Sequence, residues 1–551
     1  MPNRHPRLRR KLAAAIGVLA SMSLLAACAT SDAAPGAGGE AGEPQNGGDI
    51  TFLIDSLGDT WIPNNGSISS YQGQVWRQVT DKLVYVDEEG AVSPWVAESW
   101  EQNDDATEYT LHLKDGVTFS DGTPVDAEAV VANLDIWAKG DPERGINRIG
   151  LFPSANYGSA TAVDPATVKV TFTKPTLGFI PTLGYHGSIL LSPETIALPA
   201  EGQADLSNAV GSGAFTVESW QEGDNVVLTK REDYNWGPEA LEHTGPAYLD
   251  SITYKIVAEQ SLRTASVQSS QADVGYNASP QELEALSAEG FQVATPRYLG
   301  FAYGFAVDTR VEPFGETAVR QAFQHGIDRQ EILDTVYTDD WQAAESFIQS
   351  NVPEARDHSA AFAYDPEESE RLLDEAGWVA GADGVRTKDG KRLEVTLHPT
   401  PYLATSQPVD ELIAQQLTRI GFDVKLEAFD VITYGERVTN KEGIAVEEPT
   451  RSFIDIGTVA GVLTSVNGGE DWFGLGESDT TLNDFATGIS TASDTEARAQ
   501  LADDLQAYVL EQGYYVPITQ IVQRIYVQQP GLQGVTYDGV AFANYATAWL
   551  S

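Results

Sequence analysis

Apolar and polar residues alternate in short runs along much of the chain, and this two-residue period predicts β-strands. The runs lie at residues 49–54, 109–113, 167–172, 226–229, 252–256, 301–307 and 422–429. Elsewhere apolar residues recur every three or four positions, which predicts helices with one buried face. These segments are residues 69–83, 126–134, 317–327, 366–376, 409–419 and 495–511. Strands and helices alternate through most of the second half, so α/β lobes are expected.

Residue types that suit turns and helix ends support several of these boundaries. Asp126 can cap the first turn of its helix, and Gly377 can end the helix before it. The dipeptide Asp389-Gly390 between two short extended runs predicts a β-hairpin. Roughly 500 residues follow residue 48 without an internal repeat or a long linker, so two to four domains with intertwined boundaries are expected.

The N-terminal segment has the pattern of a bacterial export signal. Basic residues at positions 4–11 precede an apolar run at residues 12–25, and Ala26-Ala27 leads to Cys28. The apolar run is shorter than the ~20 residues that span a bilayer. Small residues before a lone Cys resemble the lipobox of bacterial lipoproteins, in which the thiol is lipidated. We therefore expect a signal peptide at residues 1–27 and an anchor at Cys28 on the outer face of the cell membrane; a secreted protein with a Cys near the cut by chance is the alternative.

Composition adds a tether and a strongly acidic surface. Residues 28–48 are rich in Ala, Gly, Pro, Glu and Ser, which favours a flexible tether. Cys28 is the only Cys, so the chain cannot form an internal disulfide. The formal charge is −46, and removal of the basic signal would make it about −51. Such a chain should be repelled by nucleic acid and by anionic lipid, and a solvated acidic surface explains the charge most simply.

Several motifs occur in the order found in one family of exported binding proteins. The most specific block joins AESW at residues 97–100 to YTLHLKDGVTFSDGTPV at residues 109–125. Further segments are LLSPE at 190–194, VGSGAF at 210–215, KREDYNW at 230–236, PF at 313–314, VRQAF at 319–323, IDR at 327–329, AGW at 376–378 and YVPI at 515–518. Together they resemble the family 5 extracytoplasmic solute-binding proteins, the oligopeptide, dipeptide and nickel binding class, over nearly all of residues 49–551.

The resemblance implies a periplasmic-binding-protein-like α/β clamp of the class II, cluster C type, with two lobes and an additional domain. In such a clamp the solute lies between the lobes, and closure of a hinge buries it. The expected ranges are residues 49–85, 191–300 and 521–551 for lobe I, residues 86–190 for the additional domain, and residues 301–520 for lobe II.

Some motif residues predict structure more than ligand chemistry. Residues 120–124 are typical of a turn before a helix, and Gly211-Ser212-Gly213 is typical of a tight turn before a strand. Arg320 and Asp328 are expected to be structural partners within lobe II.

Motifs of common catalytic and cofactor sites are absent from the sequence. It contains no H-E-x-x-H, no G-x-S-x-G, no P-loop, no Rossmann fingerprint and no catalytic Cys. Scattered carboxylates could be paired into a glycosidase-like site, but with so many acidic residues such a pair has no specificity. No cofactor and no metal site are expected, and a secreted hydrolase is the weakest functional alternative.

The ligand is less well specified than the fold. Peptide binders of the family carry a late W-x-x-D-Y segment whose Asp pairs with the amino terminus of the peptide. The corresponding residues 453–473 lack this motif: Asp455 lies in an expected strand, and Glu470, Asp471 and Trp472 come later. This departure argues against assigning a peptide. His186, His325 or His398 could serve a nickel chelate, with packed or surface histidines as the alternative.

Aromatic residues and a few charges are the candidate ligand-binding residues, since pockets favour aromatic walls with a few placed polar groups. We predict that Trp61, Tyr303, Tyr402 and Trp472 line the site and that Arg451 or Asp455 supplies a charged anchor. For each aromatic residue, packing in the core is the alternative.

The expected function is that of a monomeric binding subunit of an ABC importer. It would capture a small molecule or a peptide and deliver it to permease subunits at the membrane. A lipoprotein that senses a ligand or mediates adhesion on the same fold is an alternative that the sequence leaves open.

Overall fold

The computed structural model describes residues 43–551 except residues 59, 67–70, 186, 339–340 and 467–468. The predicted signal peptide, Cys28, most of the predicted tether and the candidate His186 lie outside the described residues. Within the described part of the chain, no helix combines the length and the apolar character needed to cross a membrane.

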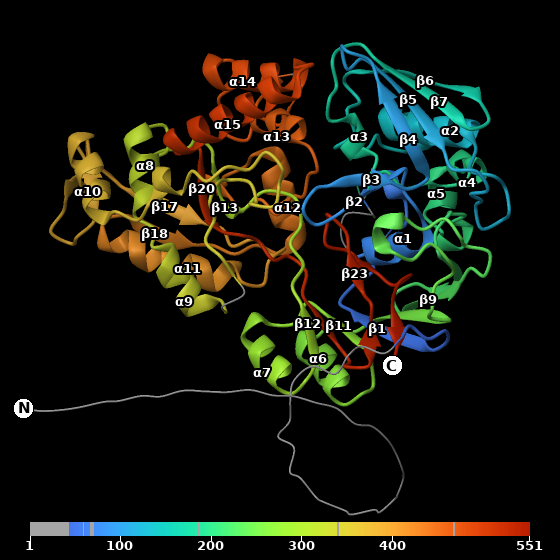
Figure 1. The fold of residues 1–551 in the computed structure, drawn as a ribbon. Coiled ribbons are helices and arrows are strands. Elements are labelled where there is room, and N and C mark those ends of the chain that lie inside the picture. Colours follow the sequence, from blue (N-terminus) through green and yellow to red (C-terminus); the bar gives the residue numbers. More distant parts are fainter. Residues whose placement is uncertain (1–42, 59, 67–70, 186, 339–340, 467–468) are drawn as a thin grey trace, which may run out of the picture. The chain divides into compact units, whose positions relative to one another are not determined.

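The largest sheet, in lobe I, is mixed and seven-stranded, and the N-terminal strand β1 (Asp49–Ile54) lies inside it (Figure 1). β1 pairs in parallel with β10 (Ser251–Ile256) and β11 (Val274–Tyr276), so both of its edges are covered. The strand order is β12-β21-β11-β1-β10-β9-β8. The other strands are β8 (Phe215–Gln221), β9 (Asn225–Lys230), β12 (Gln292–Ala294) and β21 (Tyr526–Gln528), and helices α1 (Gly73–Val79), α6 (Gln260–Gln268) and α7 (Leu283–Ala288) complete this part.

The additional domain is built on a four-stranded antiparallel sheet with the order β4-β5-β7-β6. Alternate residues of β5 (Glu108–Leu113) and β7 (Thr167–Phe172) are buried, as their two-residue period requires. Helix α2 (Ala127–Lys139) packs on this sheet, and the Asp126 carboxylate accepts a hydrogen bond from the Ala129 N–H at 3.0 Å, which confirms the predicted cap. The remaining elements are β4 (Ala97–Gln102), β6 (Tyr157–Asp164) and α3 (Phe179–Thr182).

The described residues of lobe II contain three small sheets. One has the order β19-β13-β20, with β13 (Tyr303–Val307) in its centre, and a second pairs β17 with β18 in parallel. The third, β14-β15-β16, spans residues 379–392 and includes the predicted hairpin at Asp389-Gly390. The other strands are β17 (Glu394–Leu397), β18 (Asp423–Leu426), β19 (Val446–Glu447) and β20 (Tyr515–Thr519). The helices are α8 (Thr317–His325), α9 (Arg329–Val336), α10 (Pro366–Glu375), α11 (Ser406–Arg419), α12 (Val431–Asn440), α13 (Ile456–Leu463), α14 (Thr480–Thr491) and α15 (Thr495–Glu511).

Further short helices and strands complete these units. They are β2 (Val84–Val86), β3 (Val92–Pro94), α4 (Pro193–Ala197), α5 (Ala200–Gln203), β14 (Val379–Ala380), β15 (Arg386–Lys388), β16 (Lys391–Arg392), β22 (Leu532–Gln533), β23 (Thr536–Tyr537), β24 (Ala543–Asn544) and β25 (Trp549–Leu550). The chain leaves the lobe I sheet after β12, enters lobe II at β13, and returns from β20 to β21. These two crossing segments are where a hinge would lie.

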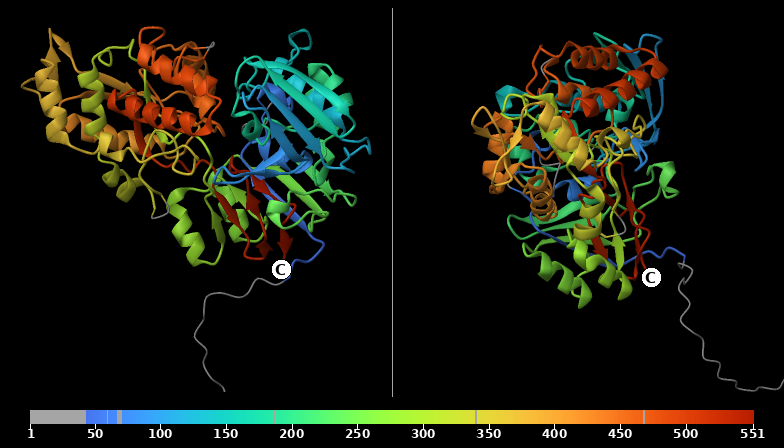
Figure 2. Two further views of the ribbon diagram at one scale, coloured as in Figure 1. Left: turned by 45° about the horizontal axis from the view of Figure 1, so that its top comes forward. Right: turned by 90° about the vertical axis from the view of Figure 1, so that its left-hand side faces the viewer.

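The buried apolar side chains do not divide in the same way as the sheets. The largest cluster runs from lobe I through the additional domain and continues into α13, α14 and α15. A second cluster fills the rest of lobe II around β13, α8 and α11. Figure 2 (left) shows α13–α15, in orange and red, on the side of lobe II that faces the teal additional domain. A Cβ at Gly178 of that domain would lie within 2.4 Å of the Asp455 carboxyl group at the start of α13. Helices α13–α15 therefore bridge between the main body of lobe II and the additional domain.

Most predicted elements are confirmed, and the departures have local causes. The predicted helix at residues 69–83 is shorter, since α1 ends at Val79 and Thr80 is extended. Beyond it, the buried Lys82 pairs with Asp538 at 3.1 Å, and a methyl group at Gly211 would overlap the backbone of Val79. These long-range contacts end the helix at Val79 and hold residues 80–83 outside it, which helical spacing does not reveal.

Two other predictions were also wrong. Asp455 does not lie in a strand but caps the start of α13, where its carboxylate accepts a hydrogen bond from the Gly457 N–H at 2.8 Å. The strand predicted at residues 422–429 is confined to β18. Arg320 has the expected structural role, because its guanidinium donates to the carbonyls of Gln512 and Phe314.

Lobe II buries two carboxyl groups beside β13. Asp410 and Glu448 are almost inaccessible to solvent, and Glu448 accepts hydrogen bonds from the Tyr303 hydroxyl at 3.0 Å and the Ser406 hydroxyl at 2.6 Å. Burial raises the pKa of Glu448 to about 7, and burial together with the charge of Glu448 raises the pKa of Asp410. Both oxygens of Asp410 and Oε1 of Glu448 have no hydrogen-bond partner among the described residues, so we expect the two carboxyl groups to share a proton instead of carrying two uncompensated buried charges.

Stability should therefore fall as this proton is lost. The folded state keeps the proton at pH values where the unfolded carboxyl groups are ionised, so the free energy of unfolding decreases as pH rises from about 4 to about 7. Asp410→Asn replaces the proton donor with an amide and should weaken this decrease, which thermal unfolding between pH 5 and pH 8 measures. Asp104→Asn, at an exposed position, is the control. An Asp410→Asn profile parallel to that of the unmodified chain would contradict the shared proton.

Candidate functional site

A cavity of about 370 Å³ lies between the additional domain and helices α13–α15. Its first wall consists of residues 148–156 and 176–182, which include the start of α3. Its second wall consists of residues between 455 and 466, Gly469 and Glu470, the C-terminal part of α14, and Arg498 of α15. In Figure 1 these segments face each other at the top of the view. The cavity is within the usual size range for small-molecule sites.

Apolar side chains make up much of both walls. Leu151, Phe152 and Leu177 come from the first wall, while Val462 and Ile489 come from the second. Phe152 is fixed by ring contacts with Trp137 and Phe179, whose centroids both lie 6.2 Å away. The cavity can therefore hold the apolar part of a solute against a rigid surface.

Asp455 and Arg498 form a buried ion pair in the second wall. Arg498 Nη1 and Nη2 each donate to one carboxylate oxygen of Asp455 at 2.7 Å, and Arg498 Nε donates to the Ile489 carbonyl at 3.2 Å. Burial would lower the pKa of Arg498, but the charge and hydrogen bonds of Asp455 raise it above its ordinary value. The pair thus joins the starts of α13 and α15 to the end of α14, and it uses both oxygens of Asp455.

Arg451, Glu470 and Trp472 form a second group at the edge of the same wall. Arg451 Nη1 donates to both carboxylate oxygens of Glu470 at 2.6 Å, and the Trp472 indole N–H donates to Glu470 at 3.0 Å. The Arg451 guanidinium also lies over the Trp472 ring, 5.3 Å from its centroid. Burial would raise the pKa of Glu470, but Arg451 holds it below its ordinary value. Of these three residues, Glu470 lines the cavity.

Arg148 is the remaining charged residue of the lining. It is exposed, and its side chain makes no ion pair or hydrogen bond within the described part of the chain. Its backbone is fixed on both sides: the Asn147 carbonyl accepts from Asn64 at 2.9 Å, and the Ile149 N–H donates to the Trp137 carbonyl at 2.9 Å. A guanidinium without a partner can bind a carboxylate or phosphate through two parallel hydrogen bonds.

The predicted site residues fall into separate places. Asp455 lines the cavity, and Arg451 and Trp472 contact Glu470 at its edge. Trp61 is buried in lobe I between Trp76 and Trp220, with centroids 6.1 and 6.2 Å away. Tyr303 is buried, and its hydroxyl donates a hydrogen bond to the Glu448 carboxyl group at 3.0 Å. Tyr402 is 48% exposed and packs on Tyr434. A ligand-binding role for these six residues stays a prediction.

The two described candidate histidines have structural contacts. His398 is buried, bonds the Glu427 carbonyl at 2.9 Å and stacks on Phe429. His325 bonds the Ala363 carbonyl at 2.7 Å. Among the described residues, no group of three or more His, Cys, Asp or Glu side chains could hold a metal ion.

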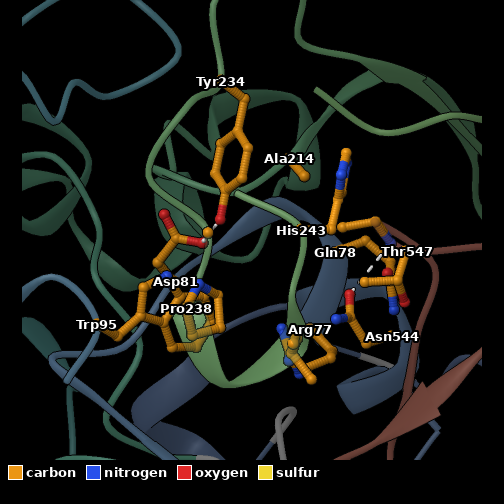
Figure 3. A pocket seen from close by; sticks show the side chains of 13 residues that line it. Arg77, Gln78, Asp81, Trp95, Ala214, Tyr234, Pro238, His243, Asn544 and Thr547 are labelled. Atoms are coloured by element: carbon orange, nitrogen blue, oxygen red, sulfur yellow. Dashed lines mark hydrogen bonds between the residues drawn. The ribbon is translucent and has the colours of Figure 1, made fainter. Parts of the chain in front are cut away.

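A second, much smaller cavity lies in lobe I (Figure 3). Its volume of about 10 Å³ has room for about one water molecule, so it cannot hold a solute. Asp81 lies beside it and accepts hydrogen bonds from Tyr234 at 3.2 Å and Trp236 at 2.8 Å. Burial nevertheless raises the pKa of Asp81 to about 6. This cavity belongs to the interior of lobe I.

The sequence model of a protein family matches this chain. The model for "Bacterial extracellular solute-binding proteins, family 5 Middle" matches residues 91–447, which is more than half of the chain. The chain belongs to this family. It is therefore a solute-binding protein and not an enzyme. The matched residues include the additional domain, the first wall of the cavity and the first crossing segment.

Curated glutathione-binding proteins are similar to this chain in sequence. The glutathione-binding protein GsiB of Salmonella paratyphi A is 29% identical over 407 residues, which cover 73% of this chain and 72% of GsiB. GsiB of Escherichia coli O157:H7 is 28% identical over the same length.

Solved structures of similar proteins confirm the predicted fold. NikA from Brucella suis in complex with Fe(III)-EDTA has a TM-score of 0.78 at 23% identity, covering 92% of this chain and all of NikA. The oligopeptide-binding protein AppA from Bacillus subtilis, in complex with a nonapeptide, has a TM-score of 0.72 at 19% identity, with coverage of 92% and 100%. This chain therefore has the predicted α/β clamp fold of the cluster C type.

Three residues of the cavity had no signal in the sequence. Arg148 and Gly178 lie in segments without periodicity. Arg498 lies in a helix, and the sequence alone does not show that this arginine is buried while other basic residues are exposed. Their roles follow from contacts between segments far apart in the chain.

The ion pair of the second wall gives a direct stability test. Arg498→Met should lower the free energy of unfolding by about 3–5 kcal/mol, because it leaves the Asp455 charge buried without a partner. Combining it with Asp455→Asn should restore most of this loss. Arg371→Met, which removes an exposed ion pair, should change stability little. Urea denaturation at pH 7 measures all four proteins, and equal losses in the single and double variants would contradict this account.

Proposed function

We propose that this chain is the solute-binding subunit of an ABC importer and that it holds a small anionic, peptide-like solute in the cavity between the additional domain and α13–α15. Membership of family 5 supports the binding role. The observation that carries the choice of site is the cavity itself, which has apolar surfaces on both walls and is lined by two structural units. A solute held in this way contacts both units at once, so binding favours the arrangement in which they are close.

The charges of the lining support an anionic solute. Asp455 is paired with Arg498, and Glu470 is paired with Arg451, so these four side chains are neutralised in two pairs. Arg148 has no such partner among the described residues. With Arg451 at its edge included, the cavity therefore has one positive charge in excess, and a solute carboxylate is a suitable partner for Arg148.

The relatives support the same class. GsiB is a glutathione-binding protein, and glutathione is a small peptide with two carboxylates. The cavity volume of about 370 Å³ is suited to a solute of this size rather than to a long peptide.

The position on the membrane is the remaining part of the proposal. Lipidation of Cys28 would hold the chain at the outer face, and residues 28–48 would give the clamp reach toward the permease. In this proposal the additional domain, residues 86–190, and lobe II, residues 301–520, hold the solute between them.

Binding of glutathione to the purified chain tests this proposal. Titration calorimetry should show binding of glutathione and much weaker binding of a glutathione diester, whose carboxylates are blocked. Arg148→Gln should weaken glutathione binding about 10- to 100-fold, which corresponds to one charged hydrogen-bonded pair. Arg419→Gln, an exposed position outside the cavity, is the matched control.

The importer role has its own readout. Deletion of the chain should abolish cellular uptake of the solute that it binds, and restoration of the chain should recover it. Equal affinity for glutathione and its diester would contradict the anionic class, while unchanged uptake after deletion would contradict the importer role.

A further inference from the structure

The two walls of the cavity touch where α3 begins. Gly178 is the residue at the start of α3, and its φ of −76° is one that any residue adopts. A methyl group added there would overlap all three atoms of the Asp455 carboxyl group on the opposite wall. A glycine is therefore needed at this position for space and not for its backbone conformation.

Asp455 has no freedom to move away from Gly178. Its carboxylate caps α13 through the Gly457 N–H at 2.8 Å and is held by two hydrogen bonds of 2.7 Å from Arg498. Gly457 is also tightly enclosed, because a Cβ there would lie 2.7 Å from Arg498 Nη2 and from Asp455 Oδ1. A side chain at position 178 could be accommodated only by separation of the two walls.

Neighbouring groups make this contact more rigid. Glu354 is half-buried close to the pair, and burial followed by the charge of Asp455 raises its pKa. On the other side, the Tyr109 hydroxyl of the additional domain donates to the Thr176 carbonyl at 2.7 Å, which fixes the segment that leads into α3. Both walls are therefore held firmly at the point where they meet.

We propose that Gly178 permits closure of the clamp. In the closed state the Asp455–Arg498 pair packs directly against Gly178, and the two walls can come together around a solute because position 178 has no side chain. The inference rests on the proposed function, since it assigns this contact to closure of the clamp. In this account Asp455 is a positioning residue that acts through the contact, and the solute does not need it as a charged anchor.

Glycines outside the lining provide matched controls. Gly245 and Gly531 do not line the cavity, and a Cβ would lie 3.6 Å from its nearest neighbouring atom at Gly245 and 3.7 Å at Gly531, which is ordinary van der Waals contact. Neither has a positive φ, so Gly245→Ala and Gly531→Ala add the same methyl group without a clash or backbone strain. A difference between these variants and Gly178→Ala isolates the contact with Asp455.

Distance measurements between two spin labels test closure directly. Cys28→Ser removes the only Cys of the full chain, so that cysteines introduced at Val163 and Val379 can be labelled specifically. Val163 lies in β6 of the additional domain and is 60% exposed, while Val379 lies in β14 of lobe II and is 66% exposed. Pulsed electron paramagnetic resonance then gives the distribution of distances without and with glutathione.

The unmodified clamp should show a short-distance population, and Gly178→Ala should lose most of it while Gly245→Ala and Gly531→Ala retain it. Glutathione affinity should fall ~10-fold or more in Gly178→Ala alone, because the closed state that binds the solute becomes rare. Adding Asp455→Ser and Arg498→Met to Gly178→Ala makes room for the methyl group, so the short-distance population should return. This recovery also separates a closure effect from a failure to fold.

Each other outcome overturns a defined part of the account. A short-distance population that survives in Gly178→Ala overturns the closure role of Gly178. A single distance in the unmodified chain, unaffected by glutathione, shows that the clamp does not move and removes the closure role as well. Movement without glutathione binding leaves the closure contact standing and instead contradicts the proposed solute class.

Discussion

The buried ion pair between Asp455 and Arg498 is the interaction on which the cavity depends. It caps α13, joins the starts of α13 and α15 to the end of α14, and places a rigid carboxylate against Gly178 of the other wall. A buried ion pair is a poor source of net stability, because desolvation of both charges offsets their attraction. Its value here is geometric: it fixes one wall of the cavity and leaves Arg148 as the charge available to a solute.

Local periodicity was sufficient to predict much of the fold. β1, β7 and α15 have the predicted bounds, because each has a clear apolar pattern and a suitable residue at its ends. Local periodicity did not predict that residues 80–83 are non-helical, because contacts with Asp538 and Gly211 determine their conformation. It also missed the helix that begins after Asp455, which depends on the contact of Asp455 with Arg498. Such partners lie far away in the sequence and leave no local pattern.

The candidate site was predicted less completely than the fold. Arg451, Asp455 and Trp472 lie in or beside the second wall, so residues 453–473 contain part of the candidate site. Aromatic character alone predicted Trp61, Tyr303 and Tyr402 as site residues, but it does not distinguish a pocket wall from the core, where Trp61 and Tyr303 are buried, or from the surface, where Tyr402 is exposed. The first wall could not be predicted, because its loop acquires a function only when α13–α15 face it.

The central claim is that one solute is held between these two walls. Hydrogen–deuterium exchange of the full chain with and without saturating glutathione tests it most directly, because exchange reports local opening segment by segment. The account predicts slower exchange in both residues 148–156 and residues 455–464, with little change around the small cavity at Asp81. Protection confined to one wall, or located away from both, would contradict it.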